Sequence, residues 1–214
     1  MSGIVVFGAA GKTGSRVVSE AAARGHAVTA VARDTGALGA LPDGVRAAAA
    51  DVTDSAAVAE LAEGADALVL AVGAREPDLH TDAVRAVVAA AKSLGAEAPR
   101  IIHMGVGANL LNDDDERIFD TPAFPEEFKP YAIGQMRALD AYRALGDEVD
   151  WTYLSPPPVH FAPGERTGHY RTGLDHPVIG EDGQARISYE DCAAALVDEI
   201  ERPHYRGRRF TVGY

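Results

Sequence analysis

A short apolar segment, Ile4–Phe7, runs directly into three glycines spaced three residues apart, Gly8, Gly11 and Gly14. The segment that follows, Ser15–Arg24, has the composition of a helix. Glycine permits a tight turn from strand to helix and lets backbone N–H groups approach phosphates, while the helix N-terminus adds a positive dipole end. This order predicts a site for a dinucleotide pyrophosphate, formed by Gly8, Gly11, Lys12, Thr13 and Gly14.

Strand and helix candidates alternate along the whole chain. Repeated strand–helix–strand units have right-handed crossovers and build a parallel sheet that is covered on both faces. We therefore expect one doubly wound α/β domain of the Rossmann type over residues 1–214, with strand order 3-2-1-4-5-6 and a C-terminal strand at the edge. The predicted strands are Ile4–Phe7, Ala27–Ala32, Val45–Ala48, Ala67–Leu70, Arg100–His103, Trp151–Leu154 and Arg209–Val212. The predicted helices are Thr13–Arg24, Ser55–Ala62, Thr81–Leu94, Glu126–Leu145 and Tyr189–Arg202, the last opened by a capping box at Ser188 and Asp191.

Two irregular stretches, Gly105–Phe124 and Ser155–Gly183, follow the fifth and sixth predicted strands. Ligands of open α/β sheets bind at the carboxyl ends of strands, and loops of this length in a compact domain are usually functional. We expect residues 155–183 to form a small irregular cap over a small-molecule substrate.

Charge and composition restrict the partners. The formal net charge of −12 argues against nucleic acid and against anionic membranes, since both require clustered cations. No apolar run approaches the roughly 20 residues that span a bilayer, and Met1–Gly3 leaves no room for a signal peptide before the first strand.

The single Cys192 is typical of a reducing cytoplasm, where we expect a monomer or homodimer. The acidic run Asp113–Glu116 lacks the spacing of a calcium loop, so no metal site is predicted.

Several motifs together resemble one family. The chain resembles the atypical short-chain dehydrogenase/reductases of the NmrA-like group, most nearly the bacterial NADH-flavin reductases and more distantly the biliverdin reductase B type. The resemblance covers nearly the whole chain and rests on Gly8–Gly14, Val28–Asp34, Asp51–Asp54, Asp150–Pro158, Pro163–Gly168 and Arg209–Val212. It implies a nicotinamide cofactor, with Asp51 and Val52 beside the adenine and Ala71, Val72 and Gly73 beside the ribose and pyrophosphate.

The end of the second predicted strand bears on the choice of nicotinamide cofactor. An acidic residue about 20 positions beyond the glycines holds the ribose 2′-hydroxyl of NAD, whereas an arginine there accommodates the 2′-phosphate of NADP. The pair at this position is Arg33–Asp34. Guanidinium pairs well with phosphate, so Arg33 favours NADPH. NADH is the alternative, with Asp34 on the ribose.

The usual catalytic machinery of the larger superfamily is incomplete. Those enzymes use a Ser, a Tyr and a Lys four residues after the Tyr, and the Lys lowers the pKa of the proton-donating Tyr. Here Tyr131 is followed by Gln135, and His103 ends the fifth strand without the expected Ser. Gln135 can hydrogen-bond a cofactor ribose but cannot stabilise a tyrosinate. We interpret Tyr131 as a packing or substrate-lining residue, and His103 as either a core residue or a proton donor.

Flavin reduction needs no strong protein acid, because the ring system takes up the charge of the hydride. The resemblance places Pro157 at the cofactor and gives His160 a role near the nicotinamide. We expect hydride transfer from NADPH to a flavin or quinone-like acceptor, beneath an aromatic cleft formed by Phe119, Phe124, Phe128, Phe161 and Tyr170. Two alternatives stay open: a non-catalytic NAD(P)-sensing protein, and a tailoring reductase, epimerase or isomerase with Tyr131 or a histidine as its acid.

Overall fold

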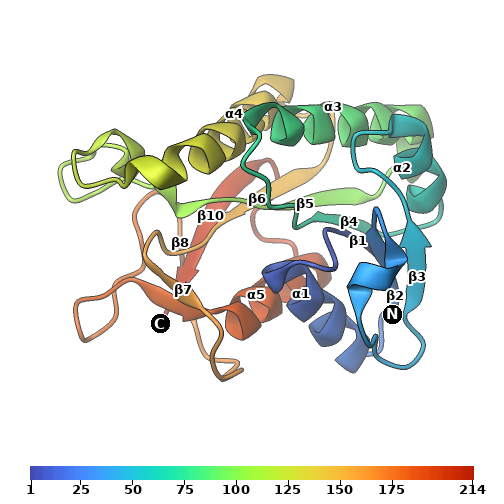
Figure 1. Cartoon of the computed structure of the whole chain (residues 1–214), viewed down its shortest axis with the longest axis horizontal. Coiled ribbons are helices and arrows are strands. Elements are labelled where there is room, and N and C mark those ends of the chain that lie inside the picture. Colours follow the sequence, from blue (N-terminus) through green and yellow to red (C-terminus); the bar gives the residue numbers. More distant parts are fainter.

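The computed structural model describes residues 1–214 and contains one eight-stranded sheet with helices on both faces (Figure 1). The strand order is β3-β2-β1-β4-β5-β6-β10-β8, parallel throughout except for β8. The strands are β1 (Gly3–Phe7), β2 (Ala27–Ala32), β3 (Arg46–Ala49), β4 (Ala67–Leu70), β5 (Arg100–Met104), β6 (Trp151–Ser155), β8 (Arg171–Gly173) and β10 (Arg208–Gly213). A second, two-stranded parallel sheet pairs β7 (His160–Ala162) with β9 (Arg186–Ser188).

The helices divide between the two faces of the main sheet. One face carries α1 (Lys12–Ala23) and α5 (Tyr189–Glu201), and the other carries α2 (Ser55–Ala62), α3 (Pro77–Leu94) and α4 (Lys129–Leu145) (Figure 1). Each face buries its own apolar cluster, of 21 residues under α1 and α5 and of 20 residues under α2, α3 and α4. The predicted doubly wound architecture is confirmed. None of the helices is long and apolar enough to span a membrane.

The predicted strand order is confirmed, but the edge of the sheet is different. β10 is not the edge strand, because β8 pairs antiparallel along its outer side, Thr211 with Gly173. The segment 155–183 is also less irregular than predicted, since Ser155 completes β6 and both β7 and β8 lie within it. Strands of three residues are too short to show an alternating pattern, so only long-range pairing reveals them.

Two helices begin three or four residues from the positions predicted, whereas the starts of the others agree to within one residue. α3 starts at Pro77 instead of Thr81, with proline at a first-turn position where its missing N–H costs nothing. α4 starts at Lys129, after a 3-10 turn at Glu126–Phe128.

The capping box before α5 is only half formed: the Ser188 hydroxyl accepts from the N–H of Asp191, at 2.9 Å. The Asp191 carboxylate accepts instead from Thr167 and Gly168, and so anchors a distant loop.

The turn between β1 and α1 is packed more closely than any side chain permits. Gly8 has φ +77°, and a Cβ placed on it would lie 2.4 Å from the carbonyl oxygen of Ala71. A Cβ on Gly14 would lie 2.2 Å from the carbonyl oxygen of Gly8. Glycine at both positions therefore lets the start of α1 approach the ends of β1 and β4.

Alanine at Gly8 tests this close approach, and Gly25 provides a matched control. Gly25 has φ +81° but open space around it, so Gly25→Ala should cost only the left-handed strain, about 1–2 kcal/mol. Gly8→Ala adds a backbone clash to the same strain and should cost about 1–3 kcal/mol more. Urea unfolding of both variants measures the difference, and equal losses of stability would contradict the packing argument.

Candidate cofactor cleft

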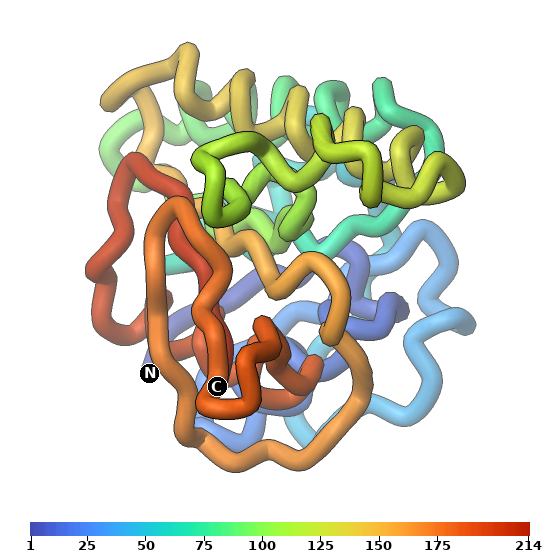
Figure 2. The backbone as a smooth tube through the Cα atoms, turned by 90° about the vertical axis from the view of Figure 1, so that its left-hand side faces the viewer, coloured from blue at the N-terminus to red at the C-terminus, as the bar shows by residue number.

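A cleft of about 420 Å³ lies where β1, β2 and β4 end. We call it the cofactor cleft. The segments 105–124 (green) and 156–170 (orange), which follow β5 and β6, lie toward the viewer in Figure 2. The lining of the cofactor cleft contains eight of the predicted cofactor residues: Gly8, Gly11, Arg33, Asp51, Val52, Ala71, Val72 and Gly73. Its other lining residues are Phe7, Ala10, Ala32, Asp34, Ala37, Ala50, Ala74 and Leu79.

Leu79 was missed because it belongs to the first turn of α3, upstream of the helix start that the sequence predicted. Ala37 belongs to the 3-10 turn Thr35–Leu38, for which the sequence carries no apolar period. Both residues add apolar surface to the lining of the cofactor cleft.

The first turn of α1 presents unpaired backbone donors. Gly11 precedes the helix and provides no side-chain cap, and the N–H groups of Lys12, Thr13 and Gly14 have no acceptor in the chain. The first bond of this turn is donated by Ser15 to the Gly11 carbonyl, at 3.0 Å. Free N–H groups and the positive end of the helix dipole together form an anion site. This geometry fits the pyrophosphate of a dinucleotide.

Two cations beside the cofactor cleft remain unpaired. The chain has 20 Lys and Arg residues, and all but Lys12, Arg33, Arg46 and Arg208 bind a carboxylate, a hydroxyl or a carbonyl of the chain. Arg33 lines the cleft and Lys12 opens α1. Free cations in an acidic chain are available to an anionic ligand.

The two acids of the cofactor cleft are partly committed to their own turns. Asp34 accepts from the N–H of Gly36 at 2.9 Å and thereby caps the 3-10 turn Thr35–Leu38. Asp51 accepts from the N–H and the hydroxyl of Thr53, and these bonds together with the charge of Arg33 lower its pKa. Both carboxylates keep one oxygen free of these bonds.

Beneath the cofactor cleft, Gln135 joins three strand ends. Its side chain is fully buried, and its amide donates to the Val72 carbonyl at 3.3 Å. Its Oε1 lies 2.9 Å from His103 Nε2 and accepts from the Tyr153 hydroxyl at 3.2 Å. Gln135 was predicted to bind the cofactor ribose, but its side chain is enclosed and its polar atoms are already bonded. In this structure its amide holds the backbone that follows β4, through the bond to the Val72 carbonyl.

His103 is a core residue. It is buried among Gln135, Tyr142 and Tyr153, stacked on the last of these with ring centroids 5.0 Å apart. Burial lowers the pKa of His103 to about 3, so the imidazole is neutral and its two nitrogens serve as one donor and one acceptor. Of the two interpretations that the sequence left open for His103, the structure therefore supports the core residue and not the proton donor.

Tyr131 lies beside Gly73, one of the residues that line the cofactor cleft. Its ring carbon Cε2 lies 3.9 Å from the position that a Cβ on Gly73 would take. It meets His80 edge-on, with ring centroids 5.6 Å apart, and His80 in turn bonds the Ala74 carbonyl at 3.0 Å. Burial raises the pKa of Tyr131. No lysine is present to lower it, so the phenol stays protonated. No pattern in the sequence singles out His80, which holds the loop after β4 through a contact made only in the fold.

The remaining predicted residues lie elsewhere. Pro157 is buried and does not line the cofactor cleft. The backbone around it is tightly packed, since a Cβ on Gly107 would come within 2.3 Å of the carbonyl oxygen of the preceding Pro156. His160 is exposed on β7 and lines a second hollow that shares no residue with the cofactor cleft. His160 and Tyr131 are therefore not brought into one pocket.

The predicted aromatic cleft is not formed. Phe119 packs on Phe124, and Phe161 meets Tyr189 edge-on at 4.4 Å. The Tyr170 hydroxyl bonds Asp198, and Phe128 is exposed. These five rings therefore do not line one cleft.

The comparisons with known proteins agree with this geometry. The profile of the NAD(P)H-binding family matches residues 8–203. The chain belongs to the NAD(P)H-binding family. It is 36% identical over 213 residues to the Bacillus subtilis "Uncharacterized protein YwnB", covering 98% of this chain and 97% of that one.

Solved structures of this family superpose over the whole chain. A "putative NADH-flavin reductase" from Streptococcus pneumoniae TIGR4 has a TM-score of 0.85 at 32% identity, covering 100% of this chain and 99% of that one. A "putative epimerase" from Bacteroides thetaiotaomicron has a TM-score of 0.90 at 32% identity, covering 100% and 97%. The expected resemblance to the atypical short-chain dehydrogenase/reductases is confirmed.

The internal role of Gln135 can be measured. Gln135→Ala removes partners from His103, Tyr153 and the Val72 carbonyl and leaves a cavity, so it should lower the free energy of unfolding by about 2–4 kcal/mol. The exposed Gln184 is the control, and Gln184→Ala should change stability by less than about 0.5 kcal/mol. Thermal and urea unfolding test this, and an unchanged midpoint for Gln135→Ala would disprove the role.

Proposed function

We propose that this protein is an NADPH-dependent oxidoreductase that transfers hydride to a flavin or a quinone-like ring. Membership of the NAD(P)H-binding family and structural neighbours with reductase names support an NAD(P)H oxidoreductase in general. The finer assignment rests on the cations of the cofactor cleft and on the incomplete proton-donating machinery.

The free guanidinium of Arg33 carries the choice of NADPH. It lines the cofactor cleft without an acidic partner, while the neighbouring Asp34 carboxylate is used to cap its own turn. Lys12 adds a second unpaired cation beside the free N–H groups of α1. A 2′-phosphate gains a charged hydrogen bond from arginine, whereas the 2′-hydroxyl of NADH does not need one.

The proposed reaction balances without a protein acid. When bound, the reduced nicotinamide supplies a hydride, which is two electrons and one proton, and becomes the oxidised form. The acceptor ring receives the hydride and takes a further proton from water. The residues of this chain would only have to hold the two rings close together, and Tyr131, with its raised pKa, would keep its proton.

Arg33→Ala tests the cofactor assignment. We expect NADPH binding to weaken by about 1.5–3 kcal/mol, which is roughly 10- to 150-fold in Kd, with NADH binding nearly unchanged. The matched control is Arg46→Ala, because Arg46 is also exposed and unpaired but begins β3, at the opposite end of the strands from the cofactor cleft. Calorimetric titration with both cofactors measures these values, and an equal loss for the two cofactors would refute the assignment.

Tyr131→Phe tests the reaction class. Because hydride transfer to a flavin or quinone needs no phenolic proton, the variant should keep kcat within about threefold of the parent, a change of less than about 1 kcal/mol in the barrier. Steady-state oxidation of NADPH with riboflavin or a benzoquinone is the measurement. A loss of turnover with unchanged NADPH affinity would favour a tailoring enzyme. Tight NADPH binding by the parent with no turnover would favour a sensor.

A further inference from the structure

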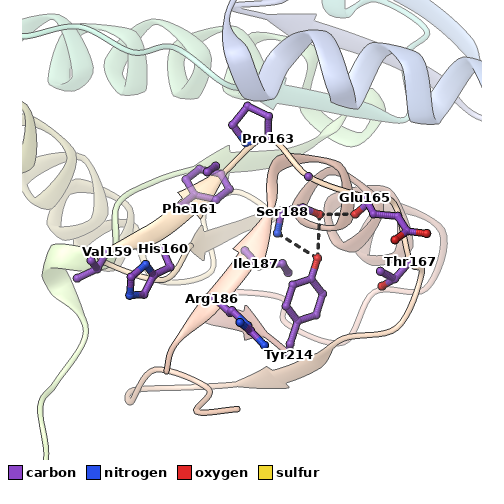
Figure 3. A pocket seen from close by; sticks show the side chains of 12 residues that line it. Val159, His160, Phe161, Pro163, Glu165, Thr167, Arg186, Ile187, Ser188 and Tyr214 are labelled. Atoms are coloured by element: carbon purple, nitrogen blue, oxygen red, sulfur yellow. Dashed lines mark hydrogen bonds between the residues drawn. The ribbon is translucent and has the colours of Figure 1, made fainter. Parts of the chain in front are cut away.

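The β7–β9 sheet forms one wall of a second hollow of about 490 Å³, a size within the range of small-molecule sites. We call it the β7–β9 hollow. Its lining combines apolar side chains with a few polar groups (Figure 3). The residues are Val159, His160, Phe161, Ala162, Pro163, Gly164, Glu165, Thr167, Arg186, Ile187, Ser188 and Tyr214.

Hydrogen bonds tie this hollow to the phosphate-binding turn. The N–H of Gly164 donates to one oxygen of Glu190, at 2.8 Å, and the other oxygen pairs with Arg16 at 3.0 Å. The Arg16 guanidinium also donates to the carbonyl of Lys12 at 3.1 Å. The wall of the β7–β9 hollow is therefore attached to the first turn of α1. The hollow also begins shortly after β6, whose end lies on the carboxyl side of the sheet.

The polar groups of the hollow are held in place. The Tyr214 hydroxyl lies 2.9 Å from the Ser188 hydroxyl and accepts from the Ser188 N–H (Figure 3). It also lies 2.8 Å from the carboxylate of Asp191. His160 faces Arg186 in the register of the two strands, so both project on the same side of the small sheet. His160 has no hydrogen-bond partner in the chain and is free to meet a ligand.

The charges of the hollow differ from those of the cofactor cleft. The Arg186 guanidinium is neutralised by Asp182 at 2.9 Å. Arg166 does not pair with its neighbour Glu165 and binds Glu20 instead, at 2.6 Å. The Glu165 carboxylate is consequently unpaired in the lining. A phosphate group would meet this negative charge and find no free cation, whereas Lys12 and Arg33 offer two at the cofactor cleft.

We propose that the β7–β9 hollow binds the hydride acceptor and that it selects an uncharged planar ring over a phosphorylated one. This inference rests on the proposed function for the identity of the acceptor. Apolar walls and the unpartnered imidazole of His160 suit a flavin ring or a quinone. Glu165 acts as the specificity-determining residue against phosphate-bearing flavins.

The experiment compares riboflavin with flavin mononucleotide, which share one ring and differ by the phosphate. Flavin fluorescence measured without any nicotinamide gives Kd for each. We expect riboflavin to bind at least about tenfold more tightly, and Glu165→Lys to remove that preference by improving mononucleotide binding about tenfold. Glu97→Lys, the same charge change on an exposed turn before β5, should alter neither Kd.

A second variant tests the location of the site. Ala162→Trp fills the exposed face of β7 and should weaken riboflavin binding at least tenfold, while Ala96→Trp, on the turn before β5, should not. Equal affinity for the two flavins, or riboflavin binding that survives Ala162→Trp, would overturn the proposal. NADPH oxidation by either flavin without the expected selectivity would overturn it while leaving the proposed function standing. Selective binding without NADPH oxidation would support the site and refute the proposed function instead.

Discussion

The cofactor cleft depends on three backbone segments lying closer together than side chains would permit. Gly8 lies against the Ala71 carbonyl, and Gly14 lies against Gly8 itself. This contact brings the start of α1 to the ends of β1 and β4, so that the free N–H groups of its first turn face the cleft. A side chain at either glycine would push the helix away and separate the donors from the strand ends.

The substitution of a lysine by a neutral amide has structural and chemical consequences. Gln135 is small and uncharged enough to be buried, and there it satisfies donors and acceptors from β4, β5 and β6 at once. A lysine at that depth would carry an unpaired charge at a large free-energy cost. The same change removes the cation that would lower the pKa of Tyr131. The neutral amide that suits this buried position therefore also leaves the pKa of Tyr131 high.

The distribution of charge explains how an acidic protein offers sites for ligands of different charge. Nearly all of its cations are engaged within the chain, including the buried Arg100 with Glu199. The few that are not include Lys12 and Arg33, both beside the cofactor cleft. The β7–β9 hollow has the opposite balance, since its arginine is paired and its glutamate is free. The two sites differ in charge although bonds through Arg16 connect them.

The sequence by itself determined the order of strands and the glycine turn, because local periodicity and backbone requirements are written in consecutive residues. Parallel strands share one carboxyl edge, which placed Arg33, Asp51 and Gly73 together without further information. Only the tertiary structure decided the partners of polar and aromatic side chains. Arg166 binds Glu20, 146 positions away, and Gln135 is enclosed by strands from distant segments. Such pairings follow from packing of elements remote in the chain, for which neighbouring residues carry no pattern.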